Sequence, residues 1–183
     1  MRASRRRWSH ATKFTDDETL ATHLRAHPAI CLAADNAPGQ KVVSGPFGAL
    51  DEFEASLDNA RLSWTRLTVG CAAHSPAMAP VADALGRALS GVSLTAPKMT
   101  FFSSLTGQRE TAPSVDHLVR QVEAPVSFRG AVSAALDAGY RHFVEVGPSA
   151  VLSPAVAAVA GARRTRHPPG GLQRVEEGVP PRR

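Results

Sequence analysis

The 183-residue chain has room for one globular domain, and with only 5% aromatic residues its core must rely on Val, Leu and Ala. Its formal charge of +5 comes from the ends: residues 1–13 carry five basic and no acidic side chains, and residues 159–183 carry six arginines against two glutamates. Neither end alternates basic with aromatic residues, and no run of about 18 apolar residues occurs. We therefore expect no nucleic-acid binding, no membrane span, no signal peptide and a cytoplasmic location.

The first half of the chain predicts a small subdomain over residues 18–70, between a basic disordered N-terminal arm over 1–17 and the second half. Its pattern reads helix, strand, strand, helix, strand, over residues 18–26, 29–34, 41–44, the helix carrying Leu50, Phe53 and Leu57, and residues 63–69. The turn residues Asn36–Gly39 join the two middle strands in a hairpin. A split strand–helix unit of this kind is typical of a ferredoxin-like subdomain.

Helices and strands alternate in the second half, as in an α/β layer. Ser75 is placed to cap a helix that has Pro76 at its first position. The further elements that we expect are a helix to about residue 90, a strand over 100–105, a short helix within 113–122, a helix from Phe128, a strand over 141–146 and an apolar helix ending near Val159. Residues 160–183 are rich in Arg, Pro and Gly without periodicity, which predicts a disordered tail.

His74 is the best candidate for chemistry, because it lies between an apolar run and the expected helix start. The positive end of a helix dipole disfavours imidazolium and suits a general base. A surface or packing histidine is the alternative. No Gly-x-Ser-x-Gly provides a nucleophile, and Ser149 lies in a sequence that approaches this motif but lacks its last glycine. Cys71 and His74 have no second pair at ligand spacing, so we expect no metal.

Four ordered segments carry a family resemblance: 36–45, 71–78, 118–128 and 144–152. Their residues and gaps resemble the C-terminal half of the malonyl-CoA:acyl-carrier-protein transacylase family, and more narrowly the acyltransferase domain of a modular polyketide synthase. The resemblance runs from about Glu18 to Val159. It implies that residues 71–159 form the C-terminal part of the acyltransferase core.

The resemblance also implies a reaction and its residues. His74 falls on the histidine of the family's catalytic Ser–His dyad, and Gln121 on the residue whose backbone carbonyl orients that imidazole. A helix-end glutamine is the alternative for Gln121. The substrates implied are acyl-CoA and a phosphopantetheinylated acyl carrier protein, with no bound cofactor, and the partners are that carrier and other polyketide synthase domains.

Acyl-group selection is implied at the residues before His74. In the family a bulky aromatic residue directly before the histidine accompanies malonyl units and a serine accompanies methylmalonyl units, whereas this chain has Ala73. The smaller side chain leaves room for an α-substituent, although Ala73 can equally be filler. Cys71 precedes it, and Asn36 either borders the acyl pocket or only forms a turn. Ser104 stands where the family usually has asparagine.

The fold class expected is thus α/β (α+β), with a ferredoxin-like subdomain inserted in part of an α/β-hydrolase-like acyltransferase core that is incomplete. The family's nucleophile elbow, carboxylate-binding arginine and oxyanion-hole residue have no counterpart in this sequence. We therefore expect a fragment of a polyketide synthase acyltransferase that does not transfer acyl groups by itself. A non-catalytic module that binds a carrier protein or a partner chain is the alternative.

Overall fold

The computed structural model describes residues 8–12, 17–67 and 71–166, with side chains for 17–67 and 71–163. Its helices are α1 (Asp17–Ala26), α2 (Phe47–Asn59), the short 3-10 helix η1 (Pro76–Met78), α3 (Ala79–Ala88), α4 (Val115–Glu123), α5 (Phe128–Asp137) and α6 (Ser153–Arg166). Its strands are β1 (Trp8–Thr12), β2 (Cys31–Ala37), β3 (Gln40–Pro46), β4 (Thr65–Leu67), β5 (Phe101–Ser103), β6 (Gln108–Glu110) and β7 (Val126–Ser127). None of the helices in these ranges is long and apolar enough to cross a membrane.

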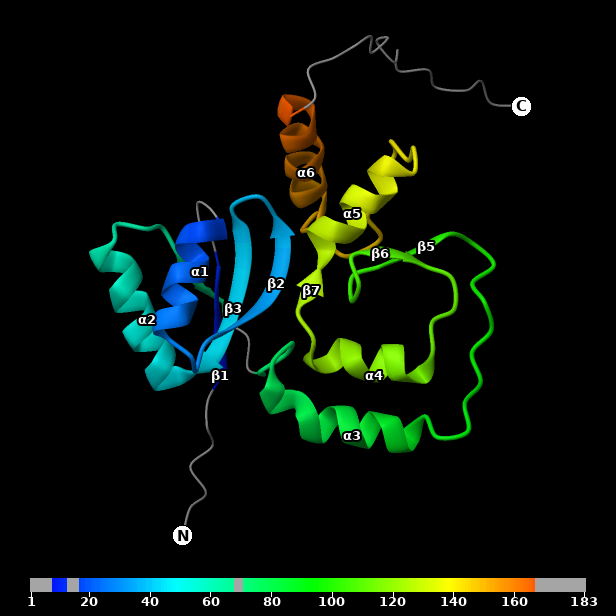
Figure 1. Ribbon diagram of the computed structural model, residues 1–183, viewed down its shortest axis with the longest axis horizontal. Helices are drawn as coiled ribbons and strands as arrows, with labels where there is room; N and C mark the ends of the chain where they lie inside the picture. The colour runs from blue at the N-terminus through cyan, green and yellow to red at the C-terminus, as the bar shows by residue number, and fades with distance from the viewer. Residues whose placement is uncertain (1–7, 13–16, 68–70, 167–183) are drawn as a thin grey trace.

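Five strands form one sheet in the order β4-β1-β3-β2-β7, and β5 and β6 form a separate hairpin (Figure 1). Strand β1 pairs antiparallel with β3 and β4, and β2 pairs antiparallel with β3 through the predicted hairpin. Gly39 in that hairpin adopts a φ of 71°, which an L side chain rarely permits. Strand β7 lies parallel to β2, with Ala34 opposite Val126. Both halves of the chain therefore contribute to one sheet.

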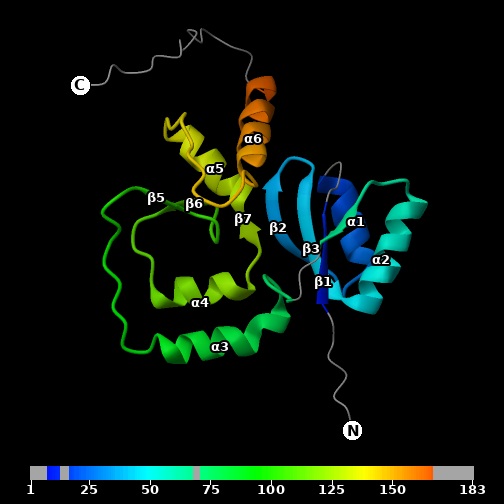
Figure 2. The same ribbon diagram turned by 180° about the vertical axis from the view of Figure 1, so that it is seen from behind.

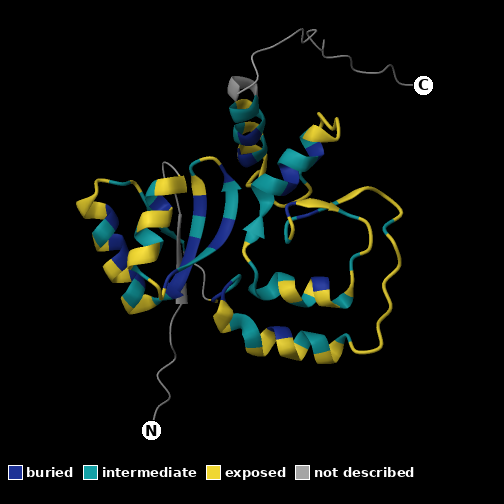
Figure 3. Ribbon diagram, in the orientation of Figure 1, coloured by how far each residue is buried: buried dark blue, intermediate teal, exposed yellow. Residues whose placement is uncertain are grey.

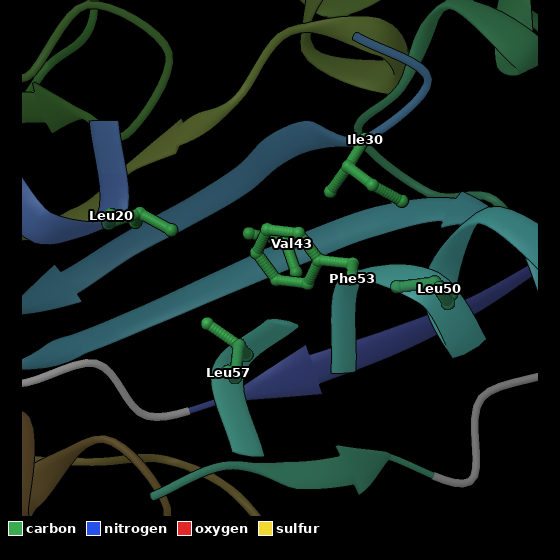
Figure 4. Packing of buried hydrophobic residues seen from close by; sticks show 6 residues of the cluster. All are labelled: Leu20, Ile30, Val43, Leu50, Phe53 and Leu57. Atoms are coloured by element: carbon green, nitrogen blue, oxygen red, sulfur yellow. The ribbon is translucent and has the colours of Figure 1, made fainter. Parts of the chain in front are cut away.

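The main hydrophobic core lies between this sheet and the helices α1 and α2, which lie on the same side of the sheet (Figures 1 and 2). The spacing of Leu50, Phe53 and Leu57 places them on one face of α2, as the sequence predicts. All three are fully buried, and Figure 4 shows the Phe53 ring packed over Val43 of β3. The cluster also contains Leu20 and Ile30.

A group of charged residues joins α1, the sheet and α5. Lys41 Nζ on β3 lies 2.9 Å from Asp17 Oδ1 and 2.6 Å from Asp35 Oδ1, and Lys41 is only 5% exposed. The Arg129 guanidinium on α5 contacts the same two carboxylates, at 2.9 Å and 3.9 Å. Burial raises the pKa of Asp17, but hydrogen bonds from Lys41 and Arg129 outweigh it and hold that pKa below its ordinary value. The buried ammonium is therefore paired, as a buried charge requires.

The β5–β6 hairpin packs closely on the start of α5. A Cβ atom at Gly107 would lie 2.5 Å from Ser127 Oγ and 3.2 Å from Gly130 Cα, and one at Gly130 would lie 2.9 Å from Gly107 Cα. Gly107 also has a φ of 69°. Gly107 is therefore required by both its positive φ and the close approach of its neighbours. Gly130 is required by the close approach alone.

The predicted mixed α/β class is confirmed, but the expected strand over residues 141–146 is absent. This segment is irregular between α5 and α6, and the side chains of Val144 and Val146 are 88% and 94% exposed. Figure 3 shows the region beyond α5 as mostly exposed. Its β-branched composition favours a strand, but a strand also needs a neighbour for its backbone N–H and C=O groups. No strand in the described ranges pairs with it.

Both ends of the chain that were expected to be disordered contain regular structure. Residues 8–12, expected within the disordered arm over 1–17, form β1 because β3 and β4 provide hydrogen-bonding partners on both sides. Helix α6 continues to Arg166, past the expected start of the tail at residue 160. Residues 1–7, 13–16 and 167–183 of the expected arm and tail lie outside the described residues, as do residues 68–69 of the strand expected over 63–69, whereas Asp17 of the expected arm begins α1.

Glu145 ties the irregular segment to the start of α6. Its two carboxylate oxygens accept hydrogen bonds from the backbone N–H groups of Val151, Leu152 and Ser153 at 2.8 to 2.9 Å, and from the Ser153 hydroxyl at 2.6 Å. The Ser153 hydroxyl is the largest contribution, followed by the backbone donors, and together they lower the pKa of Glu145 to about 2. The carboxylate thus accepts from the Ser153 N–H, a donor that the first turn of α6 leaves unpaired, and from the two residues directly before the helix.

The lowered pKa of Glu145 predicts a pH-dependent stability. Since the folded value lies below the ordinary 4.5, the ionised carboxylate stabilises the fold at neutral pH, and this contribution is lost as the pH falls from about 5 to 2. We expect Glu145→Gln to lower the melting temperature at pH 7 and to approach the parent near pH 2. Thermal denaturation across this range tests it, with Glu52→Gln, an exposed carboxylate on α2, as the control. A constant difference between Glu145→Gln and the parent at every pH would contradict the assignment.

Candidate functional site

His74 occupies a conformation that its surroundings must hold. It lies two residues before η1 and has a φ of 58°, in the left-handed region that costs a non-glycine residue roughly 1–2 kcal/mol. Its backbone N–H donates to the carbonyl of Val122 at 3.1 Å. Ser75 and Pro76 take the predicted positions at the helix start, but the Ser75 hydroxyl donates to Ala72 O at 2.6 Å and does not cap the helix as expected. This bond suits a hydroxyl that is fully buried.

The imidazole of His74 is held by the end of α4. Nδ1 lies 3.1 Å from the carbonyl oxygen of Gln121 and 3.1 Å from that of Ala124. Both partners can only accept, so Nδ1 must carry the proton. The neutral ring then has its lone pair on Nε2, which forms no hydrogen bond to the residues that the structure describes. The arrangement leaves Nε2 as a base with its ring orientation set from the other side.

The carbonyls of Gln121 and Ala124 can accept hydrogen bonds from His74 because α4 ends at Glu123. The last C=O groups of a helix lack intrahelical partners, and Pro125 prevents the helix from continuing. Ser114 caps the other end, where its side chain accepts from the His117 N–H at 3.2 Å. The hydrogen bond expected between the imidazole and the Gln121 carbonyl is thus present, and the second one, to Ala124, was not foreseen.

The Gln121 side chain has a partner of its own. Its Nε2 donates to the Ser104 hydroxyl at 2.8 Å, in the turn that follows β5. The interpretation of Gln121 as a simple helix-end residue does not account for this contact, since both its carbonyl and its amide are engaged.

The other candidate residues are less directly connected to His74. Ala73 is half-buried beside it, and Cys71 is an exposed free thiol. Asn36 is half-buried in β2, one position beyond the pairing of Asp35 with Ser127 on β7. It therefore belongs to the strand and not to the turn that its sequence predicts. Because β2 and β7 run parallel, Asn36 lies beyond Ser127, toward the start of α5 and away from the end of α4.

A second histidine cluster was not predicted. The buried Ser103 hydroxyl shares a 2.8 Å hydrogen bond with His117 Nε2 and accepts one from the Leu105 N–H at 3.0 Å. Glu110 Oε2 lies 3.7 Å from His117 Nδ1. The order serine, histidine, carboxylate is that of a hydrolase triad, but Ser103 is 0% exposed and His117 only 7%. The cluster therefore connects the hairpin to α4 and does not present a nucleophile.

This connection predicts a cost for removing the hydroxyl. Ser103→Ala leaves the buried His117 Nε2 and the half-buried Leu105 N–H unpaired, so we expect the free energy of unfolding to fall by about 1–3 kcal/mol. Urea denaturation measures it, with the exposed Ser90→Ala as a control that should stay within about 0.5 kcal/mol of the parent. Equal stability of the two variants would show that the cluster does not hold the hairpin to α4.

Comparisons with known proteins agree on one family. The protein-family model described as the acyl transferase domain matches residues 5–165 of this chain. Polyketide synthase GfsB of Streptomyces halstedii is 39% identical over 154 residues, covering 77% of this chain and 3% of that protein. Erythronolide synthase EryA2 of Saccharopolyspora erythraea is 34% identical over 142 residues, covering 76% of this chain and 4% of that protein. The chain thus spans a few per cent of the length of these relatives.

Solved structures show the same likeness. The acyltransferase domain from the second module of the salinomycin polyketide synthase superimposes with a TM-score of 0.79 at 29% identity, over 84% of this chain and 37% of that one. The malonyl-CoA:acyl carrier protein transacylase of Xanthomonas oryzae pv. oryzae gives 0.78 at 27% identity, over 87% and 53%. The chain belongs to the acyl transferase domain family, of the type found in modular polyketide synthases.

Proposed function

We propose that this chain supplies the histidine half of an acyltransferase site that moves a malonyl-type acyl group from coenzyme A to the phosphopantetheine thiol of an acyl carrier protein. The observation that carries the proposal is the pair of carbonyls that hold His74 Nδ1 and leave Nε2 as the basic atom. The family and the relatives, which are polyketide synthases, support the same reaction.

In each half-reaction, His74 takes up one proton from the nucleophile and gives it to the leaving group. In the first, Nε2 takes the proton of a serine hydroxyl as its oxygen bonds to the acyl carbon, and the proton passes to the coenzyme A sulfur when the C–S bond breaks. In the second, Nε2 takes the proton of the phosphopantetheine thiol as sulfur attacks the acyl-serine ester, and the proton returns to the serine oxygen. The backbone carbonyls of Gln121 and Ala124 stabilise the imidazolium that forms each time, the role that a carboxylate has in other triads.

We assign the serine to polypeptide outside the described residues. The surface that supports this assignment is the irregular segment between α5 and α6, where Val144 and Val146 are almost fully exposed. Beside it lies an apolar cavity of about 410 Å³ lined by Phe102, Phe128 and Phe143. Apolar surface of this kind marks a face that another segment covers. An α/β-hydrolase-like core that is incomplete in this chain and completed by such a segment is consistent with these exposures.

The order β1-α1-β2-β3-α2-β4 and the sheet order β4-β1-β3-β2 support a ferredoxin-like subdomain that begins at β1 and not at residue 18. Ala73, next to His74, would leave space for an α-substituent on the acyl group, and Cys71 and Asn36 would border the same pocket. The acyl carrier protein and other synthase domains are the proposed partners, in the cytoplasm.

A chimeric acyltransferase tests the role of His74. Residues 8–166 replace the matching segment of the acyltransferase domain from the salinomycin synthase, and transfer of malonyl-type groups to the carrier protein is measured by mass spectrometry. We expect His74→Gln to lower kcat/KM by roughly 100- to 10,000-fold. His27→Gln is the matched control, because His27 Nδ1 also contacts a backbone carbonyl, that of His23 at 2.8 Å, outside the site.

A second experiment uses the isolated chain. Incubated with malonyl-CoA, it should form no acyl adduct.

Three outcomes would contradict the proposal. A His74→Gln chimera as active as the parent would remove the histidine from the reaction. An acyl adduct on the isolated chain would show that it contains its own nucleophile. A chimera that binds the carrier protein and transfers nothing would favour the non-catalytic binding module.

A further inference from the structure

Ser104 connects two elements that meet at the site. Its hydroxyl accepts from Gln121 Nε2 at 2.8 Å, and its carbonyl accepts from the Ser127 N–H of β7 at 2.6 Å. The residue is half-buried in the turn that follows β5. Ser104 therefore contacts α4 through its side chain and the central sheet through its main chain.

The contact with α4 occurs at the residue that holds His74. Gln121 donates from its side chain to Ser104 while its carbonyl accepts from His74 Nδ1 at 3.1 Å. The Val122 and Ala124 carbonyls, which accept from the His74 N–H and from Nδ1, lie in the same last turn or directly after it. Any rotation of this turn would displace all three carbonyls together, and the Ser104 hydrogen bond opposes that rotation.

The turn that contains Ser104 is itself fixed. Its Gly107 N–H donates to Ser103 O at 2.8 Å, and Gly107 is in near-contact with Gly130 at the start of α5. Ser103 also bonds the side chain of His117 on α4 at 2.8 Å. A tether to a rigid turn restrains the helix end, whereas a tether to a mobile one would not.

We infer that Ser104 is a positioning residue for His74, acting through the Gln121 side chain. The inference rests on the proposed function, because the orientation of the imidazole matters only if Nε2 handles a proton. The pathway runs from the Ser104 hydroxyl to Gln121 Nε2, through the Gln121 main chain to its carbonyl, and from there to His74 Nδ1.

The test measures how well the His74 Nδ1 proton is protected from exchange with water, by NMR on the 15N-labelled chain. We expect Ser104→Ala to accelerate this exchange by a factor of roughly 2 to 10, the equivalent of one lost hydrogen bond. Ser104→Thr keeps the hydroxyl and should restore the parent rate. Ser114→Ala is the matched control, since it removes a hydrogen bond at the opposite end of α4 and should leave the exchange unchanged.

A second variant keeps the test decisive if Ser104→Ala does not fold. Gln121→Ala removes the donor of the same hydrogen bond and retains the carbonyl, so it should accelerate the exchange equally. Unchanged exchange in the Ser104 and Gln121 variants, or equal acceleration by Ser114→Ala, would overturn the inference. The exchange measurement needs no acyl transfer. The activity of the His74→Gln chimera therefore tests the proposed function, and the exchange rate separately tests the role of Ser104.

Discussion

The hydrogen bonds between His74 and the last carbonyls of α4 are the constraint on which the candidate site depends. Three main-chain carbonyls, those of Gln121, Val122 and Ala124, accept from one residue through its backbone and its ring. They hold His74 at a left-handed φ and assign the proton to Nδ1. Without them the ring would have no fixed tautomer and the backbone no reason to remain strained.

The rest of the fold can be understood as the support for this helix end. Strand β7 follows α4 directly and pairs with β2, so the helix end is tied to the central sheet. The hairpin packs on α5 through Gly107 and Gly130 and reaches α4 through its two serines. The ring is oriented by the main chain and not by a carboxylate, so a substitution of the Gln121 side chain keeps the carbonyl that accepts from His74. Its side chain has a separate function, the contact with Ser104.

Sequence reasoning found the parts of the fold that depend on local pattern. The spacing of Leu50, Phe53 and Leu57 predicts α2 because burial repeats with the helical period. The strand β1 was missed because its neighbours are arginines, and its stability comes from two partner strands distant in the sequence. The opposite error occurred over 141–146, where composition favours a strand and the described residues provide no partner. Strands depend on non-local pairing, which one segment's composition does not contain.

The site was predictable only in part, because its contacts, like strand pairing, join residues distant in the sequence. Motif order identified His74 and Gln121, but nothing in the spacing of Ser104, Ala124 or His117 indicates that they converge at α4. Their contacts join residues 14 to 50 positions apart. The left-handed φ of His74 was equally hidden, because few histidines adopt this conformation, although histidine does so more often than most non-glycine residues.

The most direct measurement of the central claim is a long-range 1H–15N NMR spectrum of His74 in the neutral ring, at about pH 8. We expect Nδ1 to have the chemical shift of a protonated nitrogen and Nε2 that of an unprotonated one. A ring protonated at Nε2, or an equal mixture of the two tautomers, would show that the α4 carbonyls do not hold the imidazole.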